Sequence, residues 1–412
     1  MLLSGKIMNI VIFSPSWPKS IDANGIVTYC DNIVSSLRNN GHRVFVIAIN
    51  KAEGEAQEDC IYIDRYQSTF LDKIISKAVG FFSVGFERYY LGAKAILYCI
   101  REIEKNVKID VLEMEESFGW HYLLQKKVSF PIAMRLHGPH YINGTMGNKV
   151  LTRQDFNRFK REERAFRAAR YVNAPCRWVL DEPQKKFGIK WPVQAVFFNP
   201  ISALSKSECW SSSSYVKKQI LFVGRFDAHK GGDLVIRAFA KVLAYDPGVK
   251  LVFVGPDRGV ELPSGERFFI NDAIKQYIPS SQENCVEFVG LADSEQVKLL
   301  RRHSHFTIMA SRNENFPYTV IESLASAAPI VAARVGGITE VFKDKVSGMF
   351  FEGSNVEDLA SKMITLLQDD RLLCELSGNA YYHCQSVFSP DLIARQAIGF
   401  YEQAINDYQN KA

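Results

Sequence analysis

Apolar positions fall in short runs separated by amphipathic stretches, and the first half of the chain shows the pattern clearly. An apolar run at 9–15 (NIVIFSP) precedes a loop that contains Asn24 and Gly25. Apolar residues then recur at helical spacing over 27–38, and a second apolar run follows at 43–49. The pattern predicts a strand, a helix and a second strand.

The second half repeats this plan. The run at 219–226 (QILFVGRF) is followed by a glycine-containing loop, a helical pattern over 233–245 and the run at 250–255 (KLVFVG). Runs with so little alternation are typical of parallel strands covered on both faces. We therefore expect an α/β chain with two doubly wound domains facing each other, with ligands bound at the carboxyl ends of the strands.

A domain boundary is predicted close to Asn199 and Pro200. The serine-rich stretch at 205–215 (SKSECWSSSSY) is typical of a linker or surface loop. The sequence thus predicts an N-terminal domain over 1–198 and a C-terminal domain over 199–387. A final amphipathic helix within 388–412 is expected to cross back to the first domain.

Length and composition agree with this division. A chain of 412 residues is long enough for two cores, and its eight cysteines are too scattered to indicate a zinc site or a disulfide framework. The first residues lack a secretory signal pattern, and no run of about 20 apolar residues occurs, so we expect a cytoplasmic protein without a spanning helix.

Charge is uneven along the chain. Residues 1–198 contain 28 Lys and Arg against 20 Asp and Glu, whereas residues 199–412 contain 22 against 25. The basic first half is suited to an anionic acceptor or to peripheral contact with the inner membrane surface, while an ordinary solvated basic face is the commoner explanation. No feature indicates a nucleic-acid partner.

Two cations follow the first strand of the second half. Gly224 and Arg225 end the strand, and Lys230 lies five residues further on, just before a helix. The spacing fits neither common glycine-rich phosphate motif. An Arg fork and a mobile Lys charge could neutralise a diphosphate there, and a turn with two surface cations is an equally good interpretation.

Two carboxylates mark the region 313–337 (NENFPYTVIESLASAAPIVAARVGG). Glu314 is predicted in the exit loop of one strand, and Glu322 on the helix that follows, so both can face one crevice. A carboxylate can grip neighbouring hydroxyls, which suits a ligand with two polyol parts, such as a sugar and a ribose. A glutamate near a helix start can also simply complement the helix dipole.

These features together resemble the retaining glycosyltransferases of family 4. The resemblance covers almost the whole chain and rests on the Arg225 and Lys230 loop and on the paired glutamates. Weaker matches are Gly25, the stretch at 111–117 (VLEMEES) and the stretch at 135–139 (RLHGP). It implies a GT-B fold, with two facing Rossmann-like domains and a deep inter-domain cleft.

The resemblance also implies roles. Arg225 and Lys230 would hold the donor diphosphate, Glu314 the transferred sugar, and His137 would lie near the reacting centre. The donor-binding residues it implies are Gly25, Gly224, Leu291, Phe316, Pro317, Tyr318, Thr319, Val320 and Glu322. Pro317 departs from the family pattern, because many members have glycine there, and it removes one N–H donor.

The implied reaction is retaining transfer of a sugar from a UDP- or GDP-type nucleotide sugar to a hydroxyl of a carbohydrate or lipid-linked acceptor, in glycan, polysaccharide or glycolipid biosynthesis. No Asp-x-Asp motif is present, so we expect no metal and no further cofactor. Alternatives are a non-hydrolysing nucleotide-sugar epimerase and a non-catalytic regulatory subunit that binds nucleotide sugars.

Overall fold

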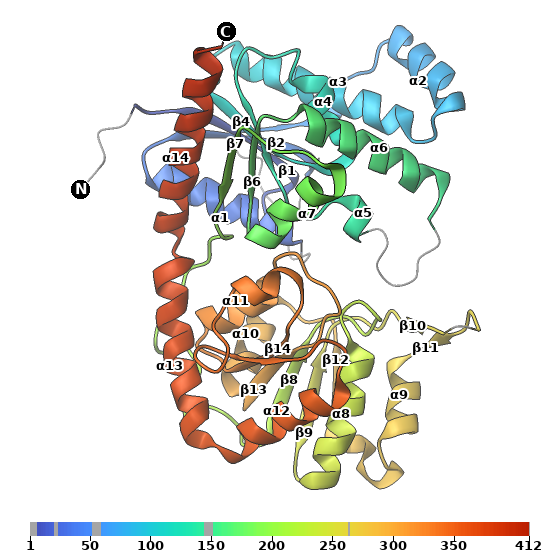
Figure 1. Ribbon diagram of the computed structural model, residues 1–412, viewed down its shortest axis with the longest axis vertical. Coiled ribbons are helices and arrows are strands. Elements are labelled where there is room, and N and C mark those ends of the chain that lie inside the picture. The colour runs from blue at the N-terminus through green and yellow to red at the C-terminus, as the bar shows by residue number, and fades with distance from the viewer. Residues whose placement is uncertain (1–5, 20–23, 52–58, 144–150, 263, 412) are drawn as a thin grey trace. The chain divides into compact units, whose positions relative to one another are not determined.

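The computed structural model describes residues 6–19, 24–51, 59–143, 151–262 and 264–411. Its contacts divide the chain into two compact units. Of the described residues, those up to Pro200 and those from Pro390 onward form the first unit, and those from Ile201 to Ser389 form the second. Figure 1 shows the elements of both units.

The first unit is built on a parallel sheet. Within the described ranges this sheet has seven strands in the order β3-β2-β1-β4-β5-β6-β7. The strands are β1 (Asn9–Trp17), β2 (Arg43–Lys51), β3 (Cys60–Tyr62), β4 (Val111–Glu115), β5 (Ile132–Arg135), β6 (Tyr171–Ala174) and β7 (Val193–Val196). The helices are α1 (Gly25–Asn39), η1 (Ile63–Arg65), α2 (Phe70–Phe82), α3 (Phe86–Glu104), η2 (Ser117–Gly119), α4 (Trp120–Leu124), α5 (His140–Asn143), α6 (Arg153–Ala168), α7 (Arg177–Phe187) and α14 (Pro390–Gln409).

The second unit repeats the architecture with a parallel sheet of six described strands, in the order β12-β9-β8-β13-β14-β15. They are β8 (Gln219–Val223), β9 (Lys250–Val254), β12 (Val286–Gly290), β13 (Phe306–Met309), β14 (Ile330–Ala333) and β15 (Met349–Phe351), and β10 (Val260–Glu261) pairs with β11 (Arg267–Phe268) as a separate hairpin. The helices are α8 (Gly232–Tyr245), α9 (Ile270–Tyr277), η3 (Ser280–Cys285), α10 (Ser294–His303), α11 (Tyr318–Ala325), η4 (Gly336–Glu340), α12 (Val356–Gln368) and α13 (Asp370–Val387).

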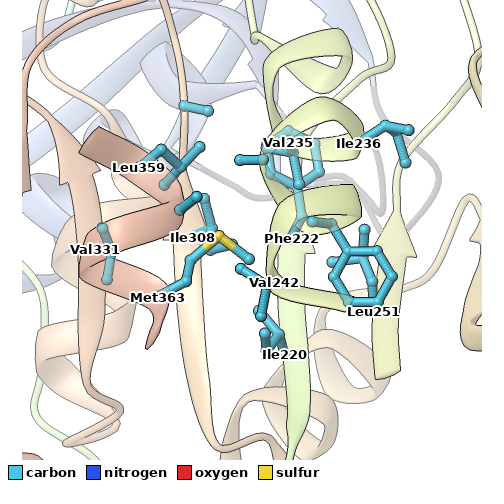
Figure 2. Close-up of a cluster of buried hydrophobic side chains, with 14 of the residues drawn as sticks. Ile220, Phe222, Val235, Ile236, Val242, Leu251, Ile308, Val331, Leu359 and Met363 are labelled. Carbon is cyan, nitrogen blue, oxygen red and sulfur yellow. The ribbon is translucent and has the colours of Figure 1, made fainter. Parts of the chain in front are cut away.

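Both faces of the second sheet are buried, which explains why its strands lack alternation. Ile220 and Phe222 of β8 pack into a large cluster with Val242 of α8 and Met363 of α12 (Figure 2). Leu221, between them in the sequence, belongs to a separate cluster with residues of β9, against which α10 packs. Burial of each such side chain contributes about 1.5–3 kcal/mol relative to exposure.

The C-terminal helix α14 belongs to the first unit. Its Tyr401 is fully buried, and the phenol donates a 2.9 Å hydrogen bond to the carboxylate of Glu113 on β4. The same carboxylate accepts hydrogen bonds from Tyr29 (2.7 Å) and Asn173 (3.0 Å). A buried carboxylate with three donors therefore fastens the end of the chain to the first sheet.

The serine-rich stretch at 205–215 has no helix or strand, but it is not a freely solvated linker. Trp210 within it is buried, and its indole N–H donates a 2.8 Å hydrogen bond to the carbonyl of Ser304. The backbone N–H of Trp210 donates to the carbonyl of Ser326 at 2.8 Å. The stretch therefore packs as an integral part of the second unit.

Candidate functional site

The two predicted site loops of the second unit leave neighbouring strands. Strand β8 pairs with β9 on one side and with β13 on the other, so the strand order reverses between β8 and β13. The loop at 224–231 follows β8, and the loop at 310–317 follows β13. In open α/β sheets, ligands bind at the carboxyl ends of the strands on either side of such a reversal.

Arg225 is the exposed cation of the first loop. Its Nε donates a 2.6 Å hydrogen bond to Oδ2 of Asp227, and Oδ1 of Asp227 accepts the backbone N–H of Lys230 at 2.7 Å. Asp227 thus orients the guanidinium and fixes the turn. Arginine has five N–H donors, and this pairing through Nε leaves the terminal nitrogens for a ligand. Asp227 is not among the site residues predicted from the sequence, although its position two residues after Arg225 was the available signal.

Lys230 and Glu314 meet across the two loops. The ammonium of Lys230 forms an ion pair with Oε1 of Glu314, which also accepts a 2.8 Å hydrogen bond from the hydroxyl of Ser311. The side chain of Glu314 is 10% exposed and that of Lys230 is 25% exposed. The structure therefore joins two residues that the resemblance assigned to different parts of the donor.

Close backbone approaches explain two glycines at this edge of the sheet. Gly231 has a φ of +71°, and a Cβ built on it would lie 2.0 Å from the carbonyl oxygen of Ala310. Gly336 has a φ of +49°, and its Cβ would lie 2.1 Å from the carbonyl oxygen of Glu314. Only glycine fits either position. A side chain at either position would push apart the backbone segments that surround Glu314.

Further contacts, which the sequence analysis did not identify, hold the two loops together. Arg312 forms a bidentate pair with Asp233 at 2.8 and 2.7 Å. The ring Nε2 of His229 lies 2.8 Å from the carbonyl oxygen of Asn313, and burial lowers the pKa of His229, which favours the neutral ring. Bidentate arginine pairs are among the stronger charged contacts, so the Glu314 loop is held in a defined position.

Glu322 lies on α11 and pairs with an arginine from α10. Nη2 of Arg301 donates to its Oε2 at 2.6 Å. The Arg301 side chain is 5% exposed, whereas that of Glu322 is 38% exposed. Among the described residues, Arg301 Nε has no hydrogen-bond partner. Glu322 therefore neutralises a buried cation, a role that was not predicted from the sequence.

The other residues predicted to bind the donor differ in exposure. The Phe316 ring is 9% exposed and lies 6.4 Å from that of Phe388, and Val320 is fully buried, so both side chains belong to the core. Leu291 is 81% exposed directly after β12. Pro317 is the N-cap of α11, and Tyr318 and Thr319 form its first turn. Gly224 donates its N–H to Val254 at 2.9 Å, between β8 and β9.

Two predicted residues belong to the first unit. Gly25 is the first residue of α1, whose N-cap Asn24 accepts the N–H of Ile26 at 3.0 Å. His137 follows β5, and its backbone N–H donates to the carboxylate of Glu116 at 3.0 Å. Burial, and secondarily the charge of Arg135, hold the pKa of His137 well below its usual value. His137 is therefore neutral at physiological pH.

The structure also shows the state of the cysteines, the grouping of possible metal ligands and the character of the helices. All eight cysteines are free thiols. Across the described ranges, no three His, Cys, Asp or Glu side chains gather as metal ligands would. None of the described helices has the length and apolar character needed to cross a bilayer.

The fold and the site define a class, namely α/β proteins with two Rossmann-like sheets and a polar site at a strand-order reversal. Two family profiles match the chain, glycosyltransferase family 4 over residues 23–202 and glycosyl transferases group 1 over residues 212–383. Together they span most of the sequence. The chain belongs to these glycosyltransferases, as the motifs predicted.

Known proteins agree with this assignment. A D-inositol 3-phosphate glycosyltransferase of Acidothermus cellulolyticus is 31% identical over 204 residues, 47% of this chain and 42% of that protein. The chain spans about half the length of such curated relatives.

Solved structures match nearly the whole chain. A sucrose-phosphate synthase of Thermosynechococcus elongatus has a TM-score of 0.72 and 16% identity, covering 96% of this chain and 98% of that one. HepE of Anabaena in complex with UDP-glucose has a TM-score of 0.66 and 15% identity, covering 96% of this chain and all of that one. The predicted GT-B fold, with two Rossmann-like domains, is confirmed.

Proposed function

We propose that the chain transfers a sugar, with retention of configuration and without a metal ion, from a nucleotide-diphosphate sugar to an acceptor hydroxyl. The observation that carries this proposal is the contact between Lys230 and Glu314 across the two loops at the strand-order reversal. A cation for phosphate and a carboxylate for hydroxyls lie side by side there. This arrangement suits a ligand in which a diphosphate and a sugar are adjacent.

Arg225 and Lys230 would bind the diphosphate. Terminal guanidinium donors of Arg225 can grip a phosphate while Asp227 holds its Nε. The ammonium of Lys230 has three donors, so it can contact phosphate while it stays close to Glu314. Positive charge at this point stabilises the diphosphate as it leaves, which lowers the barrier for transfer.

Glu314 would bind hydroxyls of the transferred sugar, and Glu322 would bind those of the ribose. The backbone of residues 316–320 and Gly224 would line the donor, and Leu291 would lie against the base. The proposal also assigns Gly25 to the donor diphosphate and His137 to the reacting centre. In the reaction, the acceptor oxygen bonds to the anomeric carbon, the bond from that carbon to the diphosphate oxygen breaks, and the acceptor proton passes to the leaving phosphate.

The donor is proposed to be of the UDP or GDP type, and UDP-glucose is the first candidate, because HepE was solved with it. The acceptor is proposed to be a carbohydrate or a lipid-linked molecule bound by the first unit. The D-inositol 3-phosphate named for one relative adds phosphorylated polyols as candidates. The donor-binding role of the second unit and the acceptor-binding role of the first are part of this proposal.

Peripheral contact with the inner membrane surface forms the last part of the proposal, and helix α2 supports it. Its polar residue Asp72 faces inward, is 2% exposed, and contacts Tyr66 at 2.5 Å and Lys94 at 3.2 Å. Apolar side chains cover its outer face instead, namely Phe70, Leu71, Ile74, Ile75 and Val79. The exposed Lys73 and Lys77 flank this face, as in helices that lie in a bilayer interface.

Incubation with candidate donors and acceptors in excess EDTA tests the reaction, with the anomeric coupling of the fresh product measured by proton NMR. We expect an α-linked product from an α-linked donor. A β-linked product, or activity that needs added magnesium or manganese, would contradict the proposed mechanism. Incubation with the donor alone separates the alternatives, because an epimerase returns an altered sugar nucleotide, whereas a transferase gives at most slow hydrolysis.

A further inference from the structure

A cavity in the first unit is lined by three arginines. Its volume is about 310 Å³, at the lower end of the range of about 300–1,000 Å³ for small-molecule sites. Its walls come from α3, η2, α5 and α6 and from the residues that precede α3 and α6. The lining residues are Gly85, Arg88, Phe118, His140, Thr152, Gln154, Asp155, Arg158 and Arg161.

Arg161 places an uncompensated charge in this wall. Its side chain is 8% exposed and donates to the carbonyl of Gly85 (2.9 Å), the hydroxyl of Ser83 (2.9 Å) and the carbonyl of Val84 (3.1 Å). Within the described ranges no carboxylate pairs with it, and burial lowers its pKa. A buried charge without a counterion is costly. An anion in the cavity would offset that cost.

Arg88 supplies a second cation, and its guanidinium can contact an anion in the cavity. Its guanidinium lies 5.3 Å from the centroid of the Phe118 ring, and Arg158 lies 4.1 Å from the same ring. Stacking on an aromatic ring holds a guanidinium in place and leaves its N–H donors in the plane free. Arg158 pairs with Glu162 at 2.7 Å, whereas among the described residues Arg88 has no carboxylate partner.

Phe118 adds an independent sign of a functional site. Its φ of +61° lies in the left-handed region, which is unfavourable for a bulky residue. Its N–H donates to the buried carboxylate of Glu162 at 3.3 Å. Residues held in such conformations cluster at ligand sites, where the surrounding structure stabilises them. Here the conformation brings the ring to within 5.3 Å of the Arg88 guanidinium and 4.1 Å of the Arg158 guanidinium.

The carboxylates near the cavity do not cancel its charge. Asp155 is held by His140 at 2.8 Å and by the hydroxyl of Thr152 at 2.6 Å, as part of the cap of α6. Counting Arg88, Arg158 and Arg161 against Asp155 and Glu162 leaves one excess positive charge among these arginines and acids. The fork of donors on each arginine matches the oxygens of a phosphate.

We infer that this cavity binds a phosphate monoester group of the acceptor. The inference rests on the proposed function, because it assigns acceptor binding to the first unit. The same chemistry could come from a soluble phosphorylated acceptor or from a lipid with a phosphate headgroup. Both would place their phosphate between Arg88 and Arg161, at a site separate from the donor diphosphate site of the second unit.

Calorimetry with two phosphate sources tests the inference. UDP is titrated first, and glycerol 3-phosphate is then titrated in saturating UDP, so that the donor site is occupied. In a parallel arm, flotation compares vesicles that contain phosphatidic acid, a phosphate monoester, with vesicles of equal negative charge that contain phosphatidylglycerol, a phosphodiester. We expect binding in at least one arm. Binding to glycerol 3-phosphate indicates a soluble acceptor, and binding only to phosphatidic acid indicates a lipid.

The decisive variant is Arg88→Gln, with Arg167→Gln as the matched control. Arg167 is exposed on α6, pairs with Glu163 and does not line the cavity. Both changes remove one positive charge, so non-specific attraction to anions weakens equally. Because Arg88 is exposed and makes no structural hydrogen bond among the described residues, both variants should melt within about 2 °C of the original protein.

Arg88→Gln should weaken phosphate binding by roughly tenfold or more, since a charged hydrogen bond is lost, and Arg167→Gln should leave it unchanged. Equal affinities for the two variants would overturn the inference. So would UDP binding without binding to either phosphate source, and that result would leave the proposed transfer reaction standing. Failure to bind UDP, GDP or any nucleotide sugar would instead contradict the proposed function.

Discussion

Replacement of Glu322 by alanine should destabilise the second unit as well as weaken donor binding. The change removes the partner of Arg301, whose side chain is 5% exposed and lies 2.6 Å from the carboxylate. The buried guanidinium would then lose its counterion, and its Nε already has no hydrogen-bond partner among the described residues. If Glu322 only bound ribose, the stability of the free protein would not change.

The magnitude follows from the burial of the pair. Loss of one partner from a fully buried ion pair costs about 3–5 kcal/mol. The Glu322 side chain is 38% exposed, so water can reach this side of Arg301 and the penalty is smaller. We expect a loss of about 2 kcal/mol, close to the value of a charged hydrogen bond. For a unit of this size, that loss lowers the melting temperature by about 4–8 °C.

A double-mutant cycle separates the two roles of Glu322. Thermal melts without ligand would compare Glu322→Ala, Arg301→Met and the double variant, and calorimetry with UDP would measure donor affinity. The double variant should recover most of the lost stability, because the stranded charge is gone, but not the affinity. An unchanged melting temperature in Glu322→Ala, or no recovery in the double variant, would refute the reasoning.

Three further predictions address the phosphate contacts, the membrane contact and the pH dependence. Lys230→Ala and Arg225→Ala should each lower kcat by more than donor affinity, with a loss of about 2–4 kcal/mol of transition-state stabilisation; full activity of both in steady-state kinetics would exclude these residues from the diphosphate site. The protein should float with anionic vesicles at low salt, and Ile74→Glu on α2 should abolish flotation, whereas Val216→Glu, at a similarly exposed position of the second unit, should not. Burial lowers the pKa of His121 to about 4, below the unfolded value of about 6.5, so its neutral form stabilises the fold at neutral pH. As the pH falls from about 6.5 to 4, the unfolded state takes up the proton first, and His121 alone should lower the free energy of unfolding by about 3 kcal/mol. Urea denaturation of His121→Gln should therefore show a free energy of unfolding that depends less on pH. The same pH dependence in both proteins would contradict the lowered pKa of His121.

Much of this protein can be predicted from its sequence. The apolar runs at 219–226 and 250–255 predicted strands buried on both faces, because residues such as Ile220 and Leu221 must each find a core on opposite sides of one sheet. The eight-residue interval between Glu314 and Glu322 placed one carboxylate in a strand-exit loop and the other on the next helix, as observed. Local periodicity and turn chemistry suffice for such features.

The pairing of charged groups depended on the tertiary structure. Lys230 and Glu314 are 84 positions apart and meet only because β8 and β13 are neighbours in the sheet. Glu322 reaches Arg301 because α10 and α11 flank the same strand, β13, along the chain. Strand order follows from the packing of the whole unit, and the local pattern of residues does not encode it.

The orientation of α2 likewise depends partly on its sequence and partly on the tertiary structure. The sequence at 70–97 mixes apolar and basic residues, which is typical of an interfacial helix, and a buried helix pair with solvated lysines explains the mixture as well. The structure turns Asp72 inward, where hydroxyls and Lys94 satisfy the carboxylate, and leaves Phe70 and Ile74 exposed. Sequence periodicity fixes which residues share a face of a helix, whereas the partners supplied by distant segments decide which face is buried, since a buried carboxylate is stable only where donors from those segments surround it.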